Sequence, residues 1–249
     1  MALSDEELDR YARHIVLPQV GGLGQRKLNA ASVAIIGAGG IGSAVIPALA
    51  GAGVSRLTII DDDVVELANL HRQPLFAEAD TGKPKAELAA AFVQRLNRFV
   101  GARAVRERIE VSNAPVLLCG HDLVVDGSDN FATRLAVSDA CVALGVPLVS
   151  AAAVRFQAQV GLFRSRPCYR CFVGNAFDAD DCDNCAELGV LGALTGTAGS
   201  FAALLVINTI VGIGGDSAGK VHLLDGEKLE WRTIRIPPDP ACKACGSVA

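Results

Sequence analysis

The feature that most constrains the fold is a glycine-rich loop between a short apolar run and a helical pattern. The run Ser32–Ile36 is typical of a buried strand, and Ser43–Ala52 is typical of a helix. A second strand is predicted over Arg56–Ile60 and ends at Asp61. Strand, glycine turn, helix and strand in this order predict a βαβ unit, whose crossover requires a parallel sheet. The glycines of the loop are Gly37, Gly39, Gly40 and Gly42.

The same alternation continues along the chain. It predicts helices over Lys85–Phe99 and Asn130–Leu144, and strands over Asp122–Asp126 and Pro147–Ala153. Alternation of this kind predicts a doubly wound, mostly parallel α/β sheet of the Rossmann-like class. Residues Phe156–Leu162 then alternate with period two, which predicts that antiparallel strands extend the sheet.

The two ends of the chain carry further elements. A capping box at Ser4–Glu7 predicts a helix that carries Tyr11, Arg13 and His14 and is ended by Pro18 and the glycine run 21–24. The acidic segment Asn175–Asn184 predicts a mobile loop. The C-terminal part is predicted to contain a helix over Thr197–Gly212 and strands over Lys220–Leu224 and Leu229–Ile236.

No linker or charge block divides the 249 residues, of which 51% are hydrophobic. One domain is therefore expected over residues 1–249. It would comprise N-terminal helices over 1–30, a nucleotide-binding core over 31–155, and a C-terminal part over 156–249 that extends the sheet.

Charge and hydropathy exclude several functional classes. A net charge of −4 argues against a nucleic-acid-binding protein, because phosphate neutralisation requires a basic patch. The acidic N-terminus has no apolar segment of a signal sequence, which predicts a cytoplasmic protein. The run Leu188–Gly214 is apolar, but hydroxyl and amide side chains interrupt it, so a buried helix is expected rather than a membrane span.

The glycine loop predicts a nucleotide site. Gly37 would permit the tight turn, Gly39 the approach of the backbone to a nucleotide, and Gly42 close helix packing. Asp61 follows at a spacing that suits a carboxylate bound to ribose hydroxyls. These features do not distinguish NAD, FAD, S-adenosylmethionine and ATP. The sequence lacks a GxxxxGK[ST] motif, so ATP would not be bound in a P-loop.

Two CxxC pairs predict a metal site. Two cysteine knuckles can close a tetrahedral zinc site, and four sulfur ligands leave no position for water. A structural zinc ion is therefore expected at Cys168, Cys171, Cys242 and Cys245.

Three further motifs carry a specific resemblance. They are DxDxVExxNLxRQ over residues 61–73, GxPKA over 82–86 and DGSDN over 126–130. Together with the glycine loop they resemble the ThiF/MoeB/HesA family of adenylyltransferases, which is similar to the nucleotide domain of ubiquitin-activating enzymes. The chain length and both CxxC pairs are most similar to the molybdopterin-synthase branch, with the thiamine branch close behind. One departure is Ala68, where the family often has serine.

The resemblance implies an ATP-dependent enzyme that adenylylates the C-terminal Gly-Gly carboxylate of a ubiquitin-like sulfur carrier. It implies that Arg72 and Lys85 hold triphosphate oxygens, Asn69 donates a hydrogen bond and Asp129 binds magnesium. Arg13 would reach into the partner's site in a homodimer. The other implied nucleotide-binding residues are Gly37, Gly39, Gly40, Gly42, Asp61, Asp63 and Gln73.

Simpler interpretations remain open for these residues. Arg72 or Lys85 taken singly could be a solvated surface charge, and Asp129 could be a helix N-cap. The competing functions are an NAD-dependent oxidoreductase, which shares the glycine loop and Asp61, and a non-catalytic binding member of the family.

The remaining cysteines raise a separate question. Cys185 matches a position where some relatives bond covalently to the carrier while others retain the cysteine without needing it. Neighbouring aspartates would raise its thiol pKa, which argues against a resting thiolate. Cys119 and Cys141 are expected to be inert core thiols. No rhodanese-like extension follows the family region, so a separate persulfide donor is expected to supply sulfur.

Overall fold

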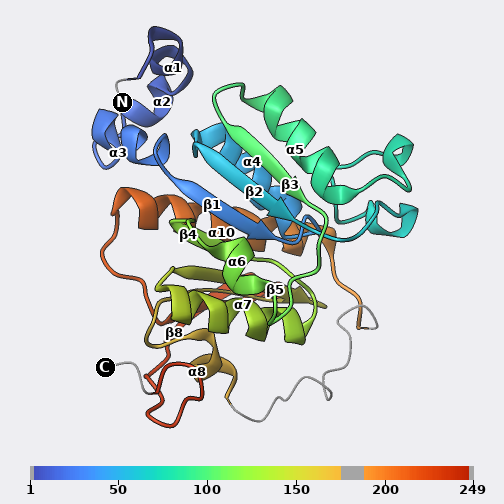
Figure 1. Cartoon of the computed structure of the whole chain (residues 1–249), viewed down its shortest axis with the longest axis vertical. Coiled ribbons are helices and arrows are strands. Elements are labelled where there is room, and N and C mark those ends of the chain that lie inside the picture. The colour runs from blue at the N-terminus through green and yellow to red at the C-terminus, as the bar shows by residue number, and fades with distance from the viewer. Residues whose placement is uncertain (1–2, 175–187, 247–249) are drawn as a thin grey trace.

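The computed structural model describes residues 3–174 and 188–246, which form an eight-stranded sheet with helices on both faces (Figure 1). The first five strands in sheet order run parallel, and the last three add antiparallel neighbours. In sheet order they are β3 (Gly101–Val105), β2 (Arg56–Ile60), β1 (Ser32–Ile36), β4 (Leu123–Asp126), β5 (Leu148–Val154), β6 (Gln157–Phe163), β7 (Lys220–Asp225) and β8 (Glu230–Arg235). The predicted mixed sheet is confirmed.

The strand order reverses at β1. The chain builds β2 and β3 on one side of this strand and then returns to place β4 and β5 on the other side. In open α/β sheets the ligand crevice lies outside the carboxyl ends of the strands at such a switch point. A ligand site is therefore expected among the loops that follow β1, β2 and β4.

Alternate residues of the strands face two hydrophobic cores. Val33 and Ile35 of β1 pack with α4, α5 and α10, while Ala34 and Ile36 pack with α6 and α7. This arrangement follows from the period of two in a strand and the helices on each face. The bounds of these helices are α4 (Gly42–Ala52), α5 (Lys85–Leu96), α6 (Ala114–Leu118), α7 (Phe131–Leu144) and α10 (Gly192–Val211).

The N-terminal region differs from the prediction. The capping box is confirmed, since the Ser4 hydroxyl accepts from the backbone N–H of Glu7 and the Glu7 carboxylate accepts from that of Ser4. The prediction of a single helix is wrong. The first helix ends at Arg10, and the glycine run 21–24 begins another helix instead of ending one. Gly24 in that run leaves room for Val211, whose Cγ1 would lie 2.8 Å from an added Cβ. The observed helices are α1 (Asp5–Arg10), α2 (Ala12–Ile15) and α3 (Gly21–Leu28).

Helix α10 begins five residues before the predicted start at Thr197. Glycine has a low helix propensity, but close packing of this helix requires it at position 199. A Cβ on Gly199 would lie 2.5 Å from the carbonyl oxygen of Ile41. The helix is long and apolar enough to cross a membrane, yet half of its most apolar window is buried inside the fold. The prediction of a core helix for this run is supported.

Smaller differences complete the comparison. Helix α5 ends at Leu96 rather than Phe99, and β3 and α6 were not predicted. Short helices α8 (Tyr169–Val173), η1 (Leu67–Asn69) and η2 (Glu78–Asp80) lie in the connections. The predicted mobile loop Asn175–Asn184 lies outside the described residues, as do Cys182 and Cys185.

Candidate functional site

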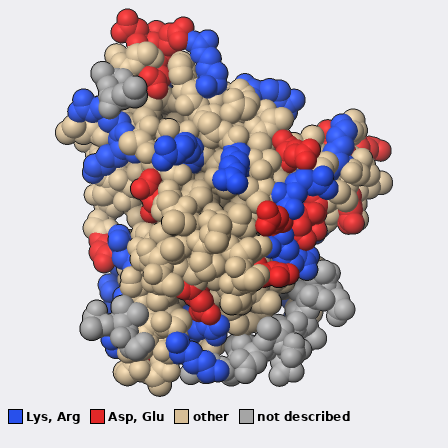
Figure 2. Space-filling view, in the orientation of Figure 1, with Lys and Arg blue, Asp and Glu red and all other residues tan. Residues whose placement is uncertain are grey.

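A cleft opens at the carboxyl ends of β1, β2 and β4, where the topology predicts a ligand site. The residues that line it come from the ends of these strands and the loops after them, from the loop before α6 and from the first turn of α7: Ile36, Gly37, Ile60, Asp61, Asp62, Asp63, Glu107, Arg108, Ile109, Ser128, Asp129, Asn130 and Thr133. Figure 2 shows acidic and basic side chains mixed over the side of the molecule where Figure 1 places the loops between β2 and α5. That view shows no uniformly basic surface of the kind that binds nucleic acid.

The glycine loop has the predicted backbone geometry. Gly37 has a φ of +86°, a conformation that side chains rarely adopt. A Cβ on Gly42 would lie 2.2 Å from the carbonyl oxygen of Gly37, so only glycine allows α4 to start so close to the turn. By contrast, a Cβ on Gly39 would meet nothing nearer than Nε2 of Gln73, at 3.6 Å. The loop is thus fixed at Gly37 and Gly42 and is more open at Gly39.

Asp61 is bonded to the glycine loop itself. Its Oδ2 accepts from the backbone N–H of Ala38 at 2.7 Å, and its Oδ1 accepts from that of Asp63 at 2.9 Å. Burial raises the pKa of this carboxyl, and the two backbone hydrogen bonds partly oppose that rise. Each oxygen keeps a second lone pair, so the carboxylate can still accept hydrogen bonds from a ribose.

Lys85 is a buried cation rather than a solvated surface charge. It is the first residue of α5 and is 3% exposed, and its Nζ lies 3.0 Å from Oδ2 of Asp63. The backbone N–H of Lys85 also donates to the Asp63 carbonyl oxygen at 3.0 Å. These two contacts hold the ammonium group beside the strand end that carries Asp61.

Arg72 is oriented by its own loop. Its Nη2 donates to Oδ1 of Asn69 at 2.9 Å, and its Nη1 lies 2.9 Å from Nε2 of His71. The next residue, Gln73, is 3% exposed, and its Oε1 has no hydrogen-bond partner within the described part of the chain. An unpaired buried carbonyl costs about 1–3 kcal/mol, so this atom is available to a donor on a ligand.

Asp129 does not cap α7. The N-cap is Asn130, whose Oδ1 accepts from the backbone N–H of Thr133 at 2.8 Å. Asp129 is exposed and lines the cleft, and no hydrogen bond or ion pair of its side chain is found among the described residues. Its carboxylate is therefore free to bind a cation.

Arg13 lies away from this cleft in its own chain. Its neighbour Tyr11 packs against Gly53 and accepts a 2.8 Å hydrogen bond from Nδ2 of Asn97. Gly53 and Asn97 precede β2 and β3, so this corner lies at the amino ends of the strands. The structure does not bring exposed Arg13 together with the other predicted site residues.

The four predicted metal ligands come together. Their Sγ atoms all lie within 4.8 Å of one another, with 3.5 Å between Cys168 and Cys242 and 3.4 Å between Cys171 and Cys245. Tetrahedral zinc with Zn–S bonds of about 2.3 Å would place the sulfur atoms about 3.8 Å apart. The cluster joins the C-terminal segment to the start of α8.

The other cysteines divide into three cases. Cys141 is buried, and desolvation raises the pKa of its thiol to about 12, as expected for an inert core thiol. The same prediction is wrong for Cys119, which is exposed because α6 ends just before it. Cys185 lies outside the described residues.

Comparison with known proteins identifies relatives over almost the whole chain. The model of the ThiF family matches residues 11–244. A sulfur carrier protein adenylyltransferase from Thermus thermophilus is 42% identical, covering 99% of this chain and 93% of the relative. A SAMP-activating enzyme E1 from Haloferax volcanii is 40% identical, covering 99% and 92%.

Two further comparisons bear on domain content and fold. The bovine adenylyltransferase and sulfurtransferase MOCS3 is 44% identical over 98% of this chain, which spans only 54% of that relative. The crystal structure of E. coli MccB with ATP superposes with a TM-score of 0.82 at 25% identity, covering 96% of this chain and 75% of MccB. The sequence motifs and the fold agree with these matches, and the chain belongs to the ThiF family.

Proposed function

We propose that this protein is an adenylyltransferase that uses ATP to activate the C-terminal Gly-Gly carboxylate of a ubiquitin-like sulfur carrier, for molybdopterin or thiamine biosynthesis. The observation that carries the proposal is the cleft at the strand ends, which Gly37, Asp63 and Asp129 line and beside which buried Lys85 pairs with Asp63. Adenylyltransferase and E1 relatives at about 40% identity over the full chain support the same reaction.

The reaction needs charge neutralisation more than proton transfer. A carboxylate is already ionised at neutral pH, so its oxygen can attack the α-phosphorus of ATP without a general base. The bond from that phosphorus to the bridging oxygen breaks, and pyrophosphate leaves as the acyl adenylate forms. Lys85 and Arg72 would stabilise the negative charge on the phosphate oxygens, in a site whose geometry exists before ATP arrives.

The other nucleotide contacts follow from position. Asp61 would accept from the ribose hydroxyls, while the glycine loop and Asp63 would lie against the phosphate and sugar. Asn69 would donate its amide N–H, which now donates to Oε2 of Glu66 at 3.2 Å. Gln73 would offer its unpaired carbonyl to a donor on the nucleotide or carrier.

Asp129 fits a magnesium ion that accompanies the triphosphate. Magnesium prefers oxygen ligands and is commonly held by one or two carboxylates together with substrate phosphates. The ion would supply additional neutralisation of the triphosphate. Asp129 meets this requirement because its carboxylate is exposed at the cleft and makes no hydrogen bond or ion pair with another described residue.

The cysteine cluster fits zinc. Four sulfur donors, without an oxygen or water position, form a closed structural site rather than a catalytic one. Zinc would bind Cys168, Cys171, Cys242 and Cys245 and hold the C-terminal segment against α8.

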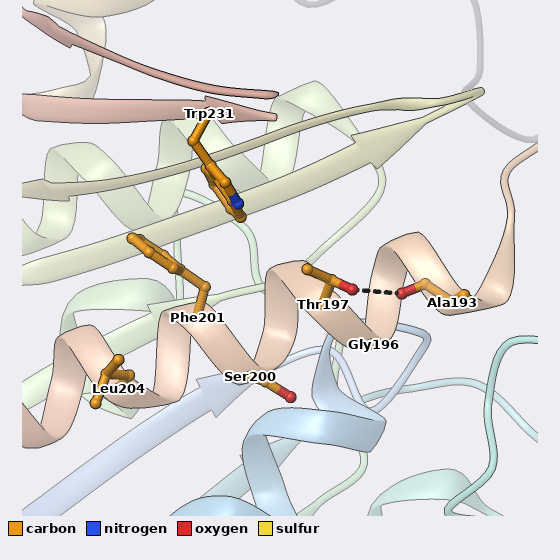
Figure 3. A pocket seen from close by; sticks show the side chains of 7 residues that line it. All are labelled: Ala193, Gly196, Thr197, Ser200, Phe201, Leu204 and Trp231. Atoms are coloured by element: carbon orange, nitrogen blue, oxygen red, sulfur yellow. Dashed lines mark hydrogen bonds between the residues drawn. The ribbon is translucent and has the colours of Figure 1, made fainter. Parts of the chain in front are cut away.

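The proposed working form is a homodimer. An uncharged groove on α10 and β8 is lined by small and apolar side chains, and Figure 3 shows Phe201 of the helix next to Trp231 of the strand, with Leu204 and Ser200 along the helix. The two rings stack with centroids 4.6 Å apart, and Leu204 is 53% exposed. Such a surface suits a second copy of the chain, whose Arg13 could then reach the nucleotide cleft of its partner.

Several finer points belong to the same proposal. One adenylation domain spans residues 1–249 and works in the cytoplasm. A separate persulfide donor supplies the sulfur. Cys185 is either a covalent attachment point for the carrier or a dispensable thiol, and Cys185→Ala activity would distinguish these.

Two other functions account for less of the site. An NAD-dependent oxidoreductase would use the glycine loop and Asp61, but would leave the buried charge of Lys85 and the cysteine cluster without a role. A non-catalytic member of the family would not need the complete charged set.

The deciding experiment is exchange of labelled pyrophosphate into ATP, with purified protein, magnesium and candidate sulfur carriers. Exchange should require a carrier that ends in Gly-Gly and should disappear when those two residues are removed. A parallel assay of NADH absorbance should give no signal. Failure of every carrier to support exchange would exclude the proposed reaction for the carriers tested and favour the non-catalytic alternative.

A further inference from the structure

Arg134 is a buried arginine that joins two segments next to the proposed site. It is 7% exposed near the start of α7, and its guanidinium donates to the carbonyl oxygen of Ser128, to Oγ of Ser150 at 3.2 Å and to the carbonyl oxygen of Ala151 at 3.0 Å. Ser128 belongs to the loop after β4, and the other two acceptors belong to β5. The planar fork of an arginine can satisfy several such acceptors at fixed angles, which a lysine cannot.

The loop that Arg134 holds is the one that presents Asp129. On the N-terminal side, Oδ1 of buried Asp126 accepts from both the backbone N–H and the hydroxyl of Ser128, at 2.9 and 2.7 Å. The backbone N–H of Gly127 donates to the carbonyl oxygen of Ile36 at 2.9 Å, which ties the loop to β1. On the C-terminal side, the carbonyl oxygen of Ser128 accepts from the guanidinium of Arg134.

The bond to the Ser128 carbonyl has a direct geometric consequence. That carbonyl and the backbone N–H of Asp129 belong to one planar peptide unit, so fixing one end fixes the plane. Asn130 then caps α7 and anchors the other end of the loop. The direction in which Asp129 leaves the backbone is therefore set by the Arg134 contact.

We propose that Arg134 is a positioning residue that orients the Asp129 carboxylate for magnesium and the triphosphate. The inference rests on the proposed function, because it takes Asp129 as the metal-binding group. Arg134 itself touches neither ATP nor metal. Burying the Arg134 cation costs desolvation energy, which an apolar side chain of similar volume between α7 and the sheet would avoid. This cost is consistent with a role other than filling the core.

The test compares three variants. Arg134→Gln removes the charge and most of the donors, while Arg134→Lys keeps the charge but loses the fork and gives a second variant with less change in the core. The matched control is Asp139→Asn, which breaks a partly buried ion pair of α7 to Arg170, at 2.6 Å, without touching the loop 126–130. All three are measured as full-length protein.

The first readout is hydrogen exchange of the backbone amides of Gly127 and Ser128, which donate to Ile36 and Asp126, without nucleotide or metal. Both Arg134 variants should lose protection there, and Asp139→Asn should not. The second readout is the magnesium concentration that gives half-maximal pyrophosphate exchange. It should rise by about 10- to 100-fold in the Arg134 variants, as is typical when a group that orients a metal ligand is removed, and manganese should restore part of the rate.

The outcomes separate the two proposals. Unchanged protection of the loop together with an unchanged magnesium midpoint would overturn the role of Arg134, even if the maximal rate or the melting temperature fell. Absence of carrier-dependent exchange in the wild-type protein would instead count against the proposed function, and the hydrogen-exchange result would still decide whether Arg134 orients the loop.

Discussion

Replacement of Lys85 by methionine should separate catalysis from stability. The Lys85 side chain is 4% exposed and is paired with Asp63, whose side chain is 58% exposed. Methionine has a similar length and is apolar, so the variant avoids the desolvation cost of a buried ammonium group. Asp63 is left to the solvent rather than buried without a partner. We therefore expect the free energy of unfolding to stay within about 1 kcal/mol of the wild type or to rise.

The rate of pyrophosphate exchange, by contrast, should fall. If Lys85 neutralises phosphate oxygens as the reaction proceeds, its loss should lower the exchange rate by about 100- to 1000-fold, or about 3–4 kcal/mol. The assays are carrier-dependent pyrophosphate exchange and urea unfolding on the same preparation. A loss of this size in a fully folded protein would be the expected signature of a group that acts on the substrate.

The control lies two residues earlier. Lys83 also pairs with an aspartate, Asp80, at 3.1 Å, but its side chain is 54% exposed. Lys83→Met should change stability by less than about 0.5 kcal/mol and should leave the exchange rate close to that of the wild type. The reasoning would be refuted by a Lys85→Met variant that keeps a wild-type exchange rate, or by one that is strongly destabilised, since the buried pair would then be structural.

Three further predictions follow from the site, the metal cluster and the groove. Mixed Arg13→Ala and Asp129→Ala subunits should recover activity at one site of each heterodimer, and an inactive mixture would contradict a role for Arg13 across the interface. Cys245→Ser should lose zinc, measured by atomic emission, and should lower the melting temperature, whereas Cys119→Ser at an exposed thiol should do neither. Gly196→Leu should yield an inactive monomer by sedimentation equilibrium, because an added Cβ meets nothing within 4 Å in the described chain but the side chain would block a second copy. Gly51→Leu on α4, where an added Cβ is equally unhindered, should stay dimeric.

Much of the α/β core could be predicted because local pattern and tertiary packing agree there. The strands β1 and β2 are confirmed residue for residue, since their apolar runs are buried on both faces of a parallel sheet. The glycine loop is equally predictable, because the positive φ of Gly37 and the contact at Gly42 leave no other residue type acceptable.

The errors arise where packing between distant segments outweighs local propensity. Glycine normally argues against a helix, yet Gly24 of α3 and Gly192 at the start of α10 lie where other chain segments approach too closely for a Cβ. β3 lacks a strong apolar pattern because it lies at the edge of the sheet. Neither condition can be recognised from neighbouring residues.

The sequence names candidate site residues by type, but it does not give the environment of each side chain. The motif identifies Lys85, but only the fold reveals that it is buried against Asp63. The alternative interpretation of Asp129 as the helix N-cap is wrong, because the structure assigns the cap to Asn130. Arg134 was missed because a single arginine in a helix gives no signal of burial, although its place four residues after Asn130 was available in the sequence.

Helix α10 links nucleotide binding to subunit association, two events that would otherwise be independent. One side of it packs on the glycine loop, where a Cβ on Gly40 would lie 3.0 Å from Thr195, and its other side forms the groove proposed to receive a second chain. The two surfaces are separated by little more than a helix diameter, about 10 Å. Any movement of α10 on nucleotide binding would therefore change the affinity between subunits, and by reciprocity subunit association would change the affinity for nucleotide by the same factor. Occupancy of the active sites could then be read from the dissociation constant of the dimer.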